Sequence, residues 1–386
     1  MNKIYLDNAA TTKPNQKVVD AMIPYLTECY YNPSSLYSES AKIKKIIEDA
    51  SNVIGEFIGA NQDEIFYVSS GSEANCMAIE GFVFNRLMKG ESSYIITTNI
   101  EHHSIEECAR AMNLLPGCNV VFIDVDKKCF VNTSSLIDAL EDAIKVTDRN
   151  NILVSIQLAN NEVGTIQDIK TISAIVHEYG AILHADAVQA FCHIPIDVKY
   201  MGIDMLSASA HKIGAAKGTG FLYKSDNIEI QPIIYGSQMR NLRGGTEDVA
   251  GIVGMAKAVE LSKNNQKNKG TISLVRDYFI DKLELIGCTL NGSKIDRLPN
   301  NINVMLPEGI GGEEMLYCLD TSGIMISTGS ACNSMSKKPS RVLKAMSLTD
   351  EEAARSIRIS ISPDITMEQI DYVIGEIEKI IKILSM

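Results

Sequence analysis

Two residues of this sequence are suited to holding an aromatic aldehyde cofactor. Lys212 ends the run SASAHK (207–212), and Asp186 lies in the apolar stretch HADAV (184–188). A lysine amine forms a Schiff base with an aldehyde, and a carboxylate keeps a pyridine nitrogen protonated so that the ring accepts electrons. Pyridoxal phosphate (PLP) needs both groups, so Lys212 and Asp186 predict a PLP enzyme.

A third reactive group is the thiol of Cys332, at the end of the small-residue run TGSAC (328–332). Lysines follow at Lys337 and Lys338, which indicates an exposed loop. The reference pKa of a cysteine is about 8.5, and nearby positive charge raises the fraction of thiolate. We therefore expect Cys332 to be a nucleophile and the other cysteines to be structural.

Glycine and serine in SGSEAN (70–75) lie between a predicted strand and a predicted helix. Backbone N–H groups at a helix N-terminus bind anions, so Gly71 and Ser72 are candidate phosphate ligands. The alternative is a plain serine cap with Glu73 in the first turn. A lysine suited to PLP elsewhere in the chain favours the phosphate site.

Polar residues also follow two other predicted strands. His102 is placed either to stack on a flat ring or to cap a helix. Asn161, in ANNEVG (159–164), is placed to hold a carboxylate or a cofactor oxygen, or else to form a turn. Glu101, His102 and His103 are adjacent and do not converge on one ion, so we expect no metal.

The remaining candidates lie near Asp186 and Lys212 in sequence or further along the chain. A buried Asp186 carboxylate needs a cationic or hydrogen-bonded partner such as a pyridinium. Gln189 is near enough in sequence to reach the ring hydroxyl, and Ser209 and His211 precede Lys212. Arg358 alternates with apolar residues on a predicted strand, where it is either salt-bridged or a carboxylate clamp. The run RGGT, ending at Thr246, offers donors to phosphate or forms a turn.

Composition restricts the class of protein. The 386 residues carry a net charge of −12 without a basic block, which argues against direct binding of nucleic acid. No apolar stretch approaches the roughly 20 residues of a membrane span, and the first residues lack the apolar region of a signal peptide. The nine cysteines form no Cys-x-x-Cys pair, which favours reduced thiols in the cytoplasm over disulfides or structural zinc.

Alternating helical and strand-like segments predict an α/β fold with a mostly parallel sheet covered on both faces. A smaller α+β region follows. We expect a large PLP-binding domain over 12–255 and a small domain from 1–11 and 256–386 that carries the cysteine loop. The expected strands are 65–68, 94–97, 120–124, 152–157, 182–185, 205–208, 220–223, 302–305 and 356–361; the expected helices are 41–57, 72–88, 104–115, 134–144, 168–179, 248–262, 271–285, 312–321 and 367–384.

Taken in order, these motifs resemble the cysteine desulfurases of the NifS/IscS-like group, in the class V aminotransferase family of fold-type I PLP enzymes (aspartate aminotransferase-like). The resemblance runs from about residue 4 to the last helix. It is carried by YLDNAATT (5–12), NPSS (32–35), the Ser72 turn, EH (101–102), NNE (160–162), Asp186 with Gln189, SAHK (209–212), RGGT (243–246), SAC (330–332) and SIR (356–358).

The resemblance implies a homodimer that removes sulfur from L-cysteine, leaving L-alanine and a persulfide on Cys332. A sulfur-acceptor or iron–sulfur scaffold protein would then receive the sulfur, for iron–sulfur cluster assembly or tRNA thiolation. Implied cofactor contacts come from Lys212, Asp186, Gln189, His102, Asn161, the phosphate ligands Gly71, Ser72, Ser209 and His211, and Thr246 of a second subunit. Asn161 and Arg358 would hold the substrate carboxylate.

Some positions depart from the family pattern: Tyr37, Cys76, Met239 and residues 214–216. None of them removes a group that does chemistry. Three other functions stay open: a selenocysteine lyase, a class V aminotransferase with no use for Cys332, and a scaffold protein without activity. Retention of the lysine, the aspartate, the arginine and the loop cysteine argues against the last.

Overall fold

A seven-stranded sheet forms the centre of the structure, a computed structural model that describes residues 3–264, 269–328 and 339–385. Its strand order is β2-β8-β7-β6-β5-β3-β4, with β8 antiparallel to both neighbours and the other pairs parallel. The strands are β2 (Ile65–Val68), β3 (Ser93–Thr98), β4 (Cys118–Ile123), β5 (Ile152–Gln157), β6 (Ile182–Asp186), β7 (Met205–Ser209) and β8 (Gly220–Lys224). The mostly parallel sheet expected from the sequence is confirmed.

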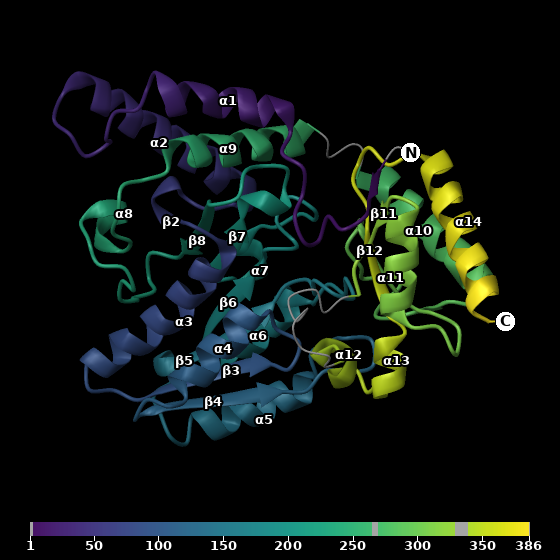
Figure 1. Cartoon of the computed structure of the whole chain (residues 1–386). Coiled ribbons are helices and arrows are strands. Elements are labelled where there is room, and N and C mark those ends of the chain that lie inside the picture. Colours follow the sequence, from purple (N-terminus) through teal and green to yellow (C-terminus); the bar gives the residue numbers. More distant parts are fainter. Residues whose placement is uncertain (1–2, 265–268, 329–338, 386) are drawn as a thin grey trace.

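Helices cover both faces of this sheet (Figure 1). On one face, α3 (Gly71–Met88) and α4 (His103–Met112) bury Phe82 and Ile105 against Ile95 and Leu222. The other face is covered by α2 (Ser38–Ile58), α5 (Thr133–Ala143), α6 (Ile169–Glu178) and α9 (Val249–Asn264). Because both faces are covered, the central strands are apolar along most of their length.

The C-terminal part has its own apolar core around Phe279, Ile302, Ile357 and Ile377. Leu6 from the start of the chain packs into it. The elements around this core are the antiparallel strands β9 (Thr289–Leu290), β10 (Asn301–Met305) and β12 (Ser356–Ser360), the parallel pair β1 (Ile4–Tyr5) and β11 (Ile324–Met325), and the helices α10 (Lys269–Leu285), α11 (Gly312–Thr321) and α14 (Met367–Leu384). The domain boundaries proposed above stay a prediction.

Several elements differ from the sequence prediction. Helix α3 begins at Gly71 rather than Ser72, because the Ser70 side chain accepts the Glu73 N–H and caps the helix. Periodicity does not reveal several short elements: the two-residue strands β9 and β11 and the helices α7 (Val198–Met201), α8 (Gln238–Asn241), α12 (Arg341–Ala345) and α13 (Asp350–Ala354). It also misses the longer helix α1 (Gln16–Thr27), which contains Pro24. Across the described ranges, no helix has the length and apolarity needed to span a membrane.

Candidate active site

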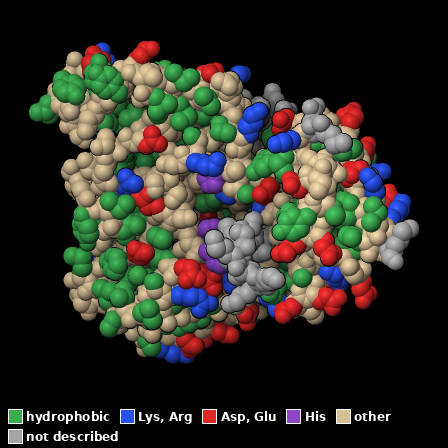
Figure 2. Space-filling model, in the orientation of Figure 1, with side chains coloured by type: hydrophobic (Ala, Val, Ile, Leu, Met, Phe, Trp, Pro, Cys, Tyr) green, Lys and Arg blue, Asp and Glu red, His purple; other side chains and the backbone are tan. Residues whose placement is uncertain are grey.

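Four adjacent strands end at one edge of the sheet, and the predicted site residues follow them. Asp186 is the last residue of β6, and Ser209 is the last residue of β7, with Lys212 in the 3-10 turn Ala210–Lys212 that follows. Asn161 follows β5, and His102 follows β3. Carboxyl ends of parallel strands are the usual ligand site of such a sheet. Histidine side chains are visible there in the central hollow of Figure 2.

Asp186 is a buried carboxylate held by neutral donors. One oxygen accepts a hydrogen bond from Asn75 Nδ2 at 2.9 Å, and the other accepts one from the Val188 N–H at 2.9 Å. The residue is 1% exposed, and within the described part of the chain no lysine or arginine forms an ion pair with it. Burying a carboxylate without a cation is costly, so the site fits a protonated pyridine.

Lys212 is held beside the start of the chain. Its Nζ donates to the carbonyl oxygen of Ala10 at 2.8 Å and to that of Ala9. Gln189 Nε2 donates to the same Ala9 carbonyl at 2.9 Å. The residues after Tyr5 therefore form one wall of the site and position two of the predicted cofactor contacts.

His102 caps α4 and is a neutral imidazole. Its Nδ1 accepts a hydrogen bond from the Ser104 N–H at 3.1 Å, which leaves the ring proton on Nε2. Burial lowers the pKa of His102, and Lys212 lowers it further, against the attraction of Asp186. The helix-cap interpretation is confirmed by the N-cap geometry, and stacking on a ring stays a prediction.

A row of hydrogen bonds connects His102 to Asp186. The Ser104 hydroxyl lies 2.8 Å from His102 Nδ1, Asn75 Nδ2 lies 3.0 Å from that hydroxyl, and Asn75 also bonds Asp186. The sequence did not single out Asn75 or Ser104. The only signal was that each lies within the first five residues of a helix that follows a strand of the sheet.

The region predicted to hold phosphate contains an unsatisfied donor. Ser209 Oγ is buried and has no hydrogen-bond partner among the described residues. A Cβ on Gly71 would lie 2.5 Å from Val188 Cγ2, so only glycine lets α3 approach the loop after Asp186 so closely. An anion bound at this helix terminus would satisfy Ser209.

Ser72 and His211 are the other two predicted phosphate ligands near α3 and Lys212, and their contact with phosphate stays a prediction. Ser72 is exposed on the first turn of α3. His211 Nδ1 lies 3.1 Å from Thr11 Oγ1, and burial, together with the nearby Lys212, lowers the pKa of His211 to about 4.

Thr246 lies on an exposed loop. It lines a pocket of about 160 Å³ together with Ser69 and Arg243. Arg243 is ion-paired with Glu73 of α3 at 2.8 Å. Within one chain Thr246 is therefore a surface residue, and its contact with phosphate stays a prediction.

Asn161 and Arg358 are brought together. Arg358 Nη1 donates to the Asn161 carbonyl at 3.1 Å, and Nη2 pairs with Asp7 at 2.7 Å. Asn161 Oδ1 accepts from Gln157 Nε2 at 3.0 Å. Arg358 is thus salt-bridged, and its use as a clamp for a substrate carboxylate stays a prediction that requires Asp7 to give way.

Cys332 lies outside the described residues, but the chain just after its segment is anchored to the sheet loops. Ser340 Oγ donates to the Glu162 carboxylate, and Arg341 Nη2 donates to the Glu101 carbonyl at 2.8 Å. Burial raises the pKa of Glu162 to about 7 and that of Glu101 to about 8. Ser340 and Arg341 therefore lie next to the strand ends that carry His102 and Asn161.

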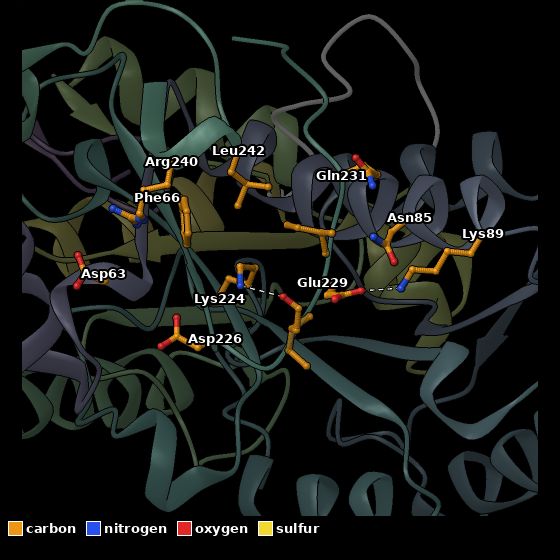
Figure 3. Close-up of a pocket in the computed structure, with 12 residues that line it drawn as sticks. Asp63, Phe66, Asn85, Lys89, Lys224, Asp226, Glu229, Gln231, Arg240 and Leu242 are labelled. Carbon is orange, nitrogen blue, oxygen red and sulfur yellow. Dashed lines mark hydrogen bonds and ion pairs between the residues drawn. The ribbon is translucent and has the colours of Figure 1, made fainter. Parts of the chain in front are cut away.

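A separate pocket of about 660 Å³ is shown in Figure 3. Residues of β2, β8 and the following loop line it, including Phe66, Lys224 and Asp226. Arg240 lies over the Phe66 ring, 4.2 Å from its centre. None of the predicted site residues lines this pocket, so it is not part of the candidate active site.

Comparisons with known proteins show which family the chain belongs to. The model of the family described as Aminotransferase class-V matches residues 4–373. A cysteine desulfurase IscS of Dictyoglomus turgidum is 42% identical, over 98% of this chain and 95% of its own length. One from Clostridium botulinum is 43% identical, over 99% of this chain and 95% of its own.

Solved structures give the same fold. A NifS-like protein superposes with a TM-score of 0.89 at 31% identity, covering 99% of this chain and 100% of that chain. A structure described as SspA in complex with cysteine gives a TM-score of 0.79 at 33% identity, over 94% of this chain and 99% of that one. The fold-type I architecture expected from the motifs is confirmed.

The buried carboxyl of Glu101 generates a testable pH dependence. An exposed glutamate has a pKa near 4.5, so between pH 4.5 and about 8 the unfolded chain releases a proton that folded Glu101 retains. Rising pH therefore destabilises the fold across this window. Glu101→Gln should flatten the pH dependence of the melting temperature there, whereas Glu107→Gln, at an exposed position of α4, should not. Equal slopes in wild type and Glu101→Gln would contradict the burial argument.

Proposed function

The chain is a cysteine desulfurase of the class V aminotransferase family, and we propose that Lys212, Asp186 and Cys332 carry out its chemistry with bound PLP. The observation that carries the proposal is the buried Asp186 carboxylate, which accepts only from neutral donors among the described residues and lies at the strand edge near Lys212. A pyridinium nitrogen would supply the missing cation. The unsatisfied Ser209 hydroxyl, next to the N-terminus of α3, fits the phosphate of the same molecule.

When bound, PLP would supply an electron sink for the Cα of an amino acid. The protein residues would hold and orient it: Asp186 at the ring nitrogen, Gln189 and Asn161 at the ring oxygen, and His102 against the ring face. Gly71, Ser72, Ser209 and His211 would surround the phosphate. Lys212 would hold the aldehyde carbon until substrate arrives, and its freed amine would then take the proton from Cα.

Arg358 and Asn161 are the proposed ligands of the substrate carboxylate. Arg358 is 4% exposed, and its guanidinium already pairs with the Asp7 carboxylate, so the pocket has the charge that a carboxylate needs. Substrate binding would exchange the Asp7 carboxylate for the substrate carboxylate at the Arg358 guanidinium. The cysteine bound to the SspA structure supports L-cysteine as the substrate.

Sulfur transfer would then use Cys332. Its thiolate attacks the substrate sulfur, a new S–S bond forms, and the Cβ–S bond breaks. The electron pair of that bond remains with the carbon fragment, which gains protons and leaves as L-alanine, while Cys332 is left as a persulfide. The persulfide would pass its sulfur to an acceptor or iron–sulfur scaffold protein.

We also propose a homodimer in a reducing compartment, the cytoplasm. In one chain Thr246 is on the surface, and a second copy would bring its Thr246 to the phosphate. The structure shows no disulfide within the described ranges, which is consistent with a reducing environment.

Lys212→Ala should abolish covalent capture of PLP at residue 212. It should also lower turnover by about 10²- to 10⁴-fold or more, since an acid–base group is lost. Sodium borohydride fixes PLP on a lysine, and the added mass is measured on the peptide that contains residue 212. Lys217→Ala, at an exposed lysine of the next loop, is the matched control and should behave as wild type. Capture of PLP by Lys212→Ala at another lysine, with normal turnover, would refute the assignment.

Cys332→Ser should still capture PLP on Lys212 and bind L-cysteine, but should form little alanine because no thiolate accepts the sulfur. The measurement is alanine formed per enzyme over time, alongside borohydride capture. Cys318→Ser, at a partly buried cysteine of α11, should keep wild-type rates. Wild-type alanine formation by Cys332→Ser would remove the loop cysteine from the mechanism.

A further inference from the structure

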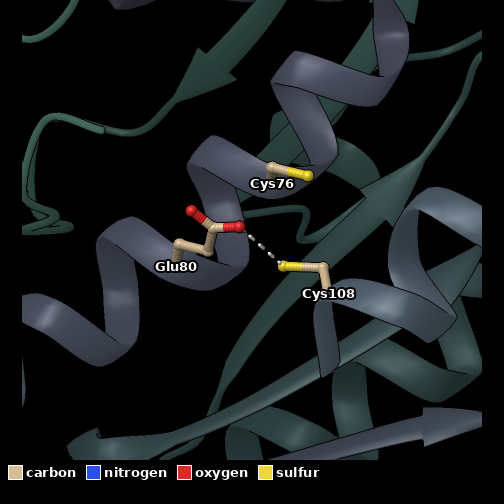
Figure 4. Close-up of side chains that lie close together, drawn as sticks. All are labelled: Cys76, Glu80 and Cys108. Carbon is tan, nitrogen blue, oxygen red and sulfur yellow. Dashed lines mark hydrogen bonds between the residues drawn. The ribbon is translucent and has the colours of Figure 1, made fainter. Parts of the chain in front are cut away.

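A cluster of two thiols and a carboxylate between α3 and α4 has no part in the proposed mechanism. Cys76 and Glu80 project from α3 and Cys108 from α4, and their sulfur and oxygen atoms all lie within 4.8 Å of one another (Figure 4). Cys76 and Glu80 are four residues apart, which places both on one face of the helix. The three side chains thus converge from two helices on one point.

One of the three ligand–ligand distances already matches a tetrahedral metal site. The Cys108 Sγ lies 3.5 Å from Glu80 Oε1. Tetrahedral zinc, with Zn–S of about 2.3 Å and Zn–O of about 2.1 Å, places a sulfur and an oxygen ligand about 3.6 Å apart. The Cys76 Sγ lies within 4.8 Å of both atoms, so it would have to move toward them by about 1 Å at most to complete the set.

The donor set selects the kind of ion. Two thiolates exclude Mg²⁺ and Ca²⁺, which take oxygen ligands, and the carboxylate suits a borderline-soft ion better than Cu(I). Cys108 is 6% exposed, whereas Cys76 and Glu80 are half-buried, so solvent can supply the fourth ligand. Zn²⁺ fits these donors best.

We propose that Cys76, Glu80 and Cys108 form a Zn²⁺ site that links α3 to α4. Binding would release the two thiol protons to solvent, with no change in oxidation state. The site is independent of the proposed function.

A second acidic group on α4 is a weaker candidate. His103, Glu106 and Glu107 also lie close together. However, Glu106 already pairs with Arg110 at 3.0 Å and with Arg341 at 2.6 Å. A metal ion would have to displace two cations, which the Cys76 cluster does not require.

The location of the proposed site gives it a structural consequence. Cys76 directly follows Asn75, which bonds both Asp186 and Ser104. The Cys76 Sγ lies 3.9 Å from the Ser104 carbonyl oxygen. An ion at this point would therefore hold together the two helices whose N-terminal residues position Asp186 and His102.

The test is a calorimetric titration of the full-length, reduced chain with Zn²⁺ after treatment with a chelator. A Cys332→Ser background, used for every variant, keeps the loop thiol from contributing. We expect one ion per chain and about two protons released. Cys76→Ser and Cys108→Ser should each bind at least about tenfold more weakly, since even the loss of a supporting residue costs that much. Cys29→Ser, at a partly buried cysteine outside the cluster, is the matched control.

Co²⁺ provides an independent readout of the ligands. In the background chain its sulfur-to-metal absorption should reflect two thiolates, and it should fall by about half in either serine variant. Glu80→Gln should keep both thiolates but lose affinity, and it should lose the rise in melting temperature that Zn²⁺ gives the background chain. Because Glu80 is half-buried, this variant tests the site even if a cysteine variant fails to fold.

Three results would overturn the proposal. One is the absence of stoichiometric Zn²⁺ binding by the background chain. Another is Zn²⁺ affinity and Co²⁺ absorption that are unchanged in both serine variants. The third is a disulfide between Cys76 and Cys108 in the enzyme purified without reductant, measured by mass spectrometry after thiol blocking, which would make the pair a redox couple instead.

Discussion

The rest of the site depends on one buried carboxylate. The side chain of Asp186, at the end of β6, is shielded from solvent, and among the described residues it accepts hydrogen bonds only from Asn75 and the Val188 backbone. A charge in this position has to be compensated, and the proposed pyridinium would do so, because the carboxylate would keep the ring nitrogen protonated. The parallel sheet explains why the other groups are nearby, because neighbouring strands end at the same edge.

The first residues of the chain connect the two apolar cores at this point. Leu6 packs with the C-terminal core, while the carbonyls of Ala9 and Ala10 accept from Lys212. Between them, Asp7 pairs with Arg358. The lysine and the arginine are thus positioned by one short segment, which explains how residues so distant in sequence share a site.

Local sequence patterns were enough to predict the parallel sheet and the two main candidate site residues. Asp186 and Lys212 stand out because charged residues end apolar strands, and the regular alternation of helices and strands gives the parallel sheet. Asn75 and Ser104 could not be identified, because their role is a hydrogen-bond row formed only when α3 and α4 pack. The short strands β9 and β11 have too few residues for periodicity, and their pairing depends on distant partners.

The cysteines show the same limit of sequence patterns. The lack of a Cys-x-x-Cys pair argued against structural zinc, yet Cys76 and Cys108 meet through the packing of two helices. Spacing along the chain reveals only sites built within one segment. Cys332 is the opposite case, since its loop of small residues is visible in the sequence while its position lies outside the described residues.

The most direct test of the desulfurase account is to incubate the wild-type chain with L-cysteine and measure alanine while mapping trapped persulfides by mass spectrometry. The account predicts alanine formation that depends on L-cysteine, together with a persulfide on Cys332. Amino-group transfer to a keto acid without any persulfide would contradict it and make the chain an aminotransferase in which Cys332 has no role.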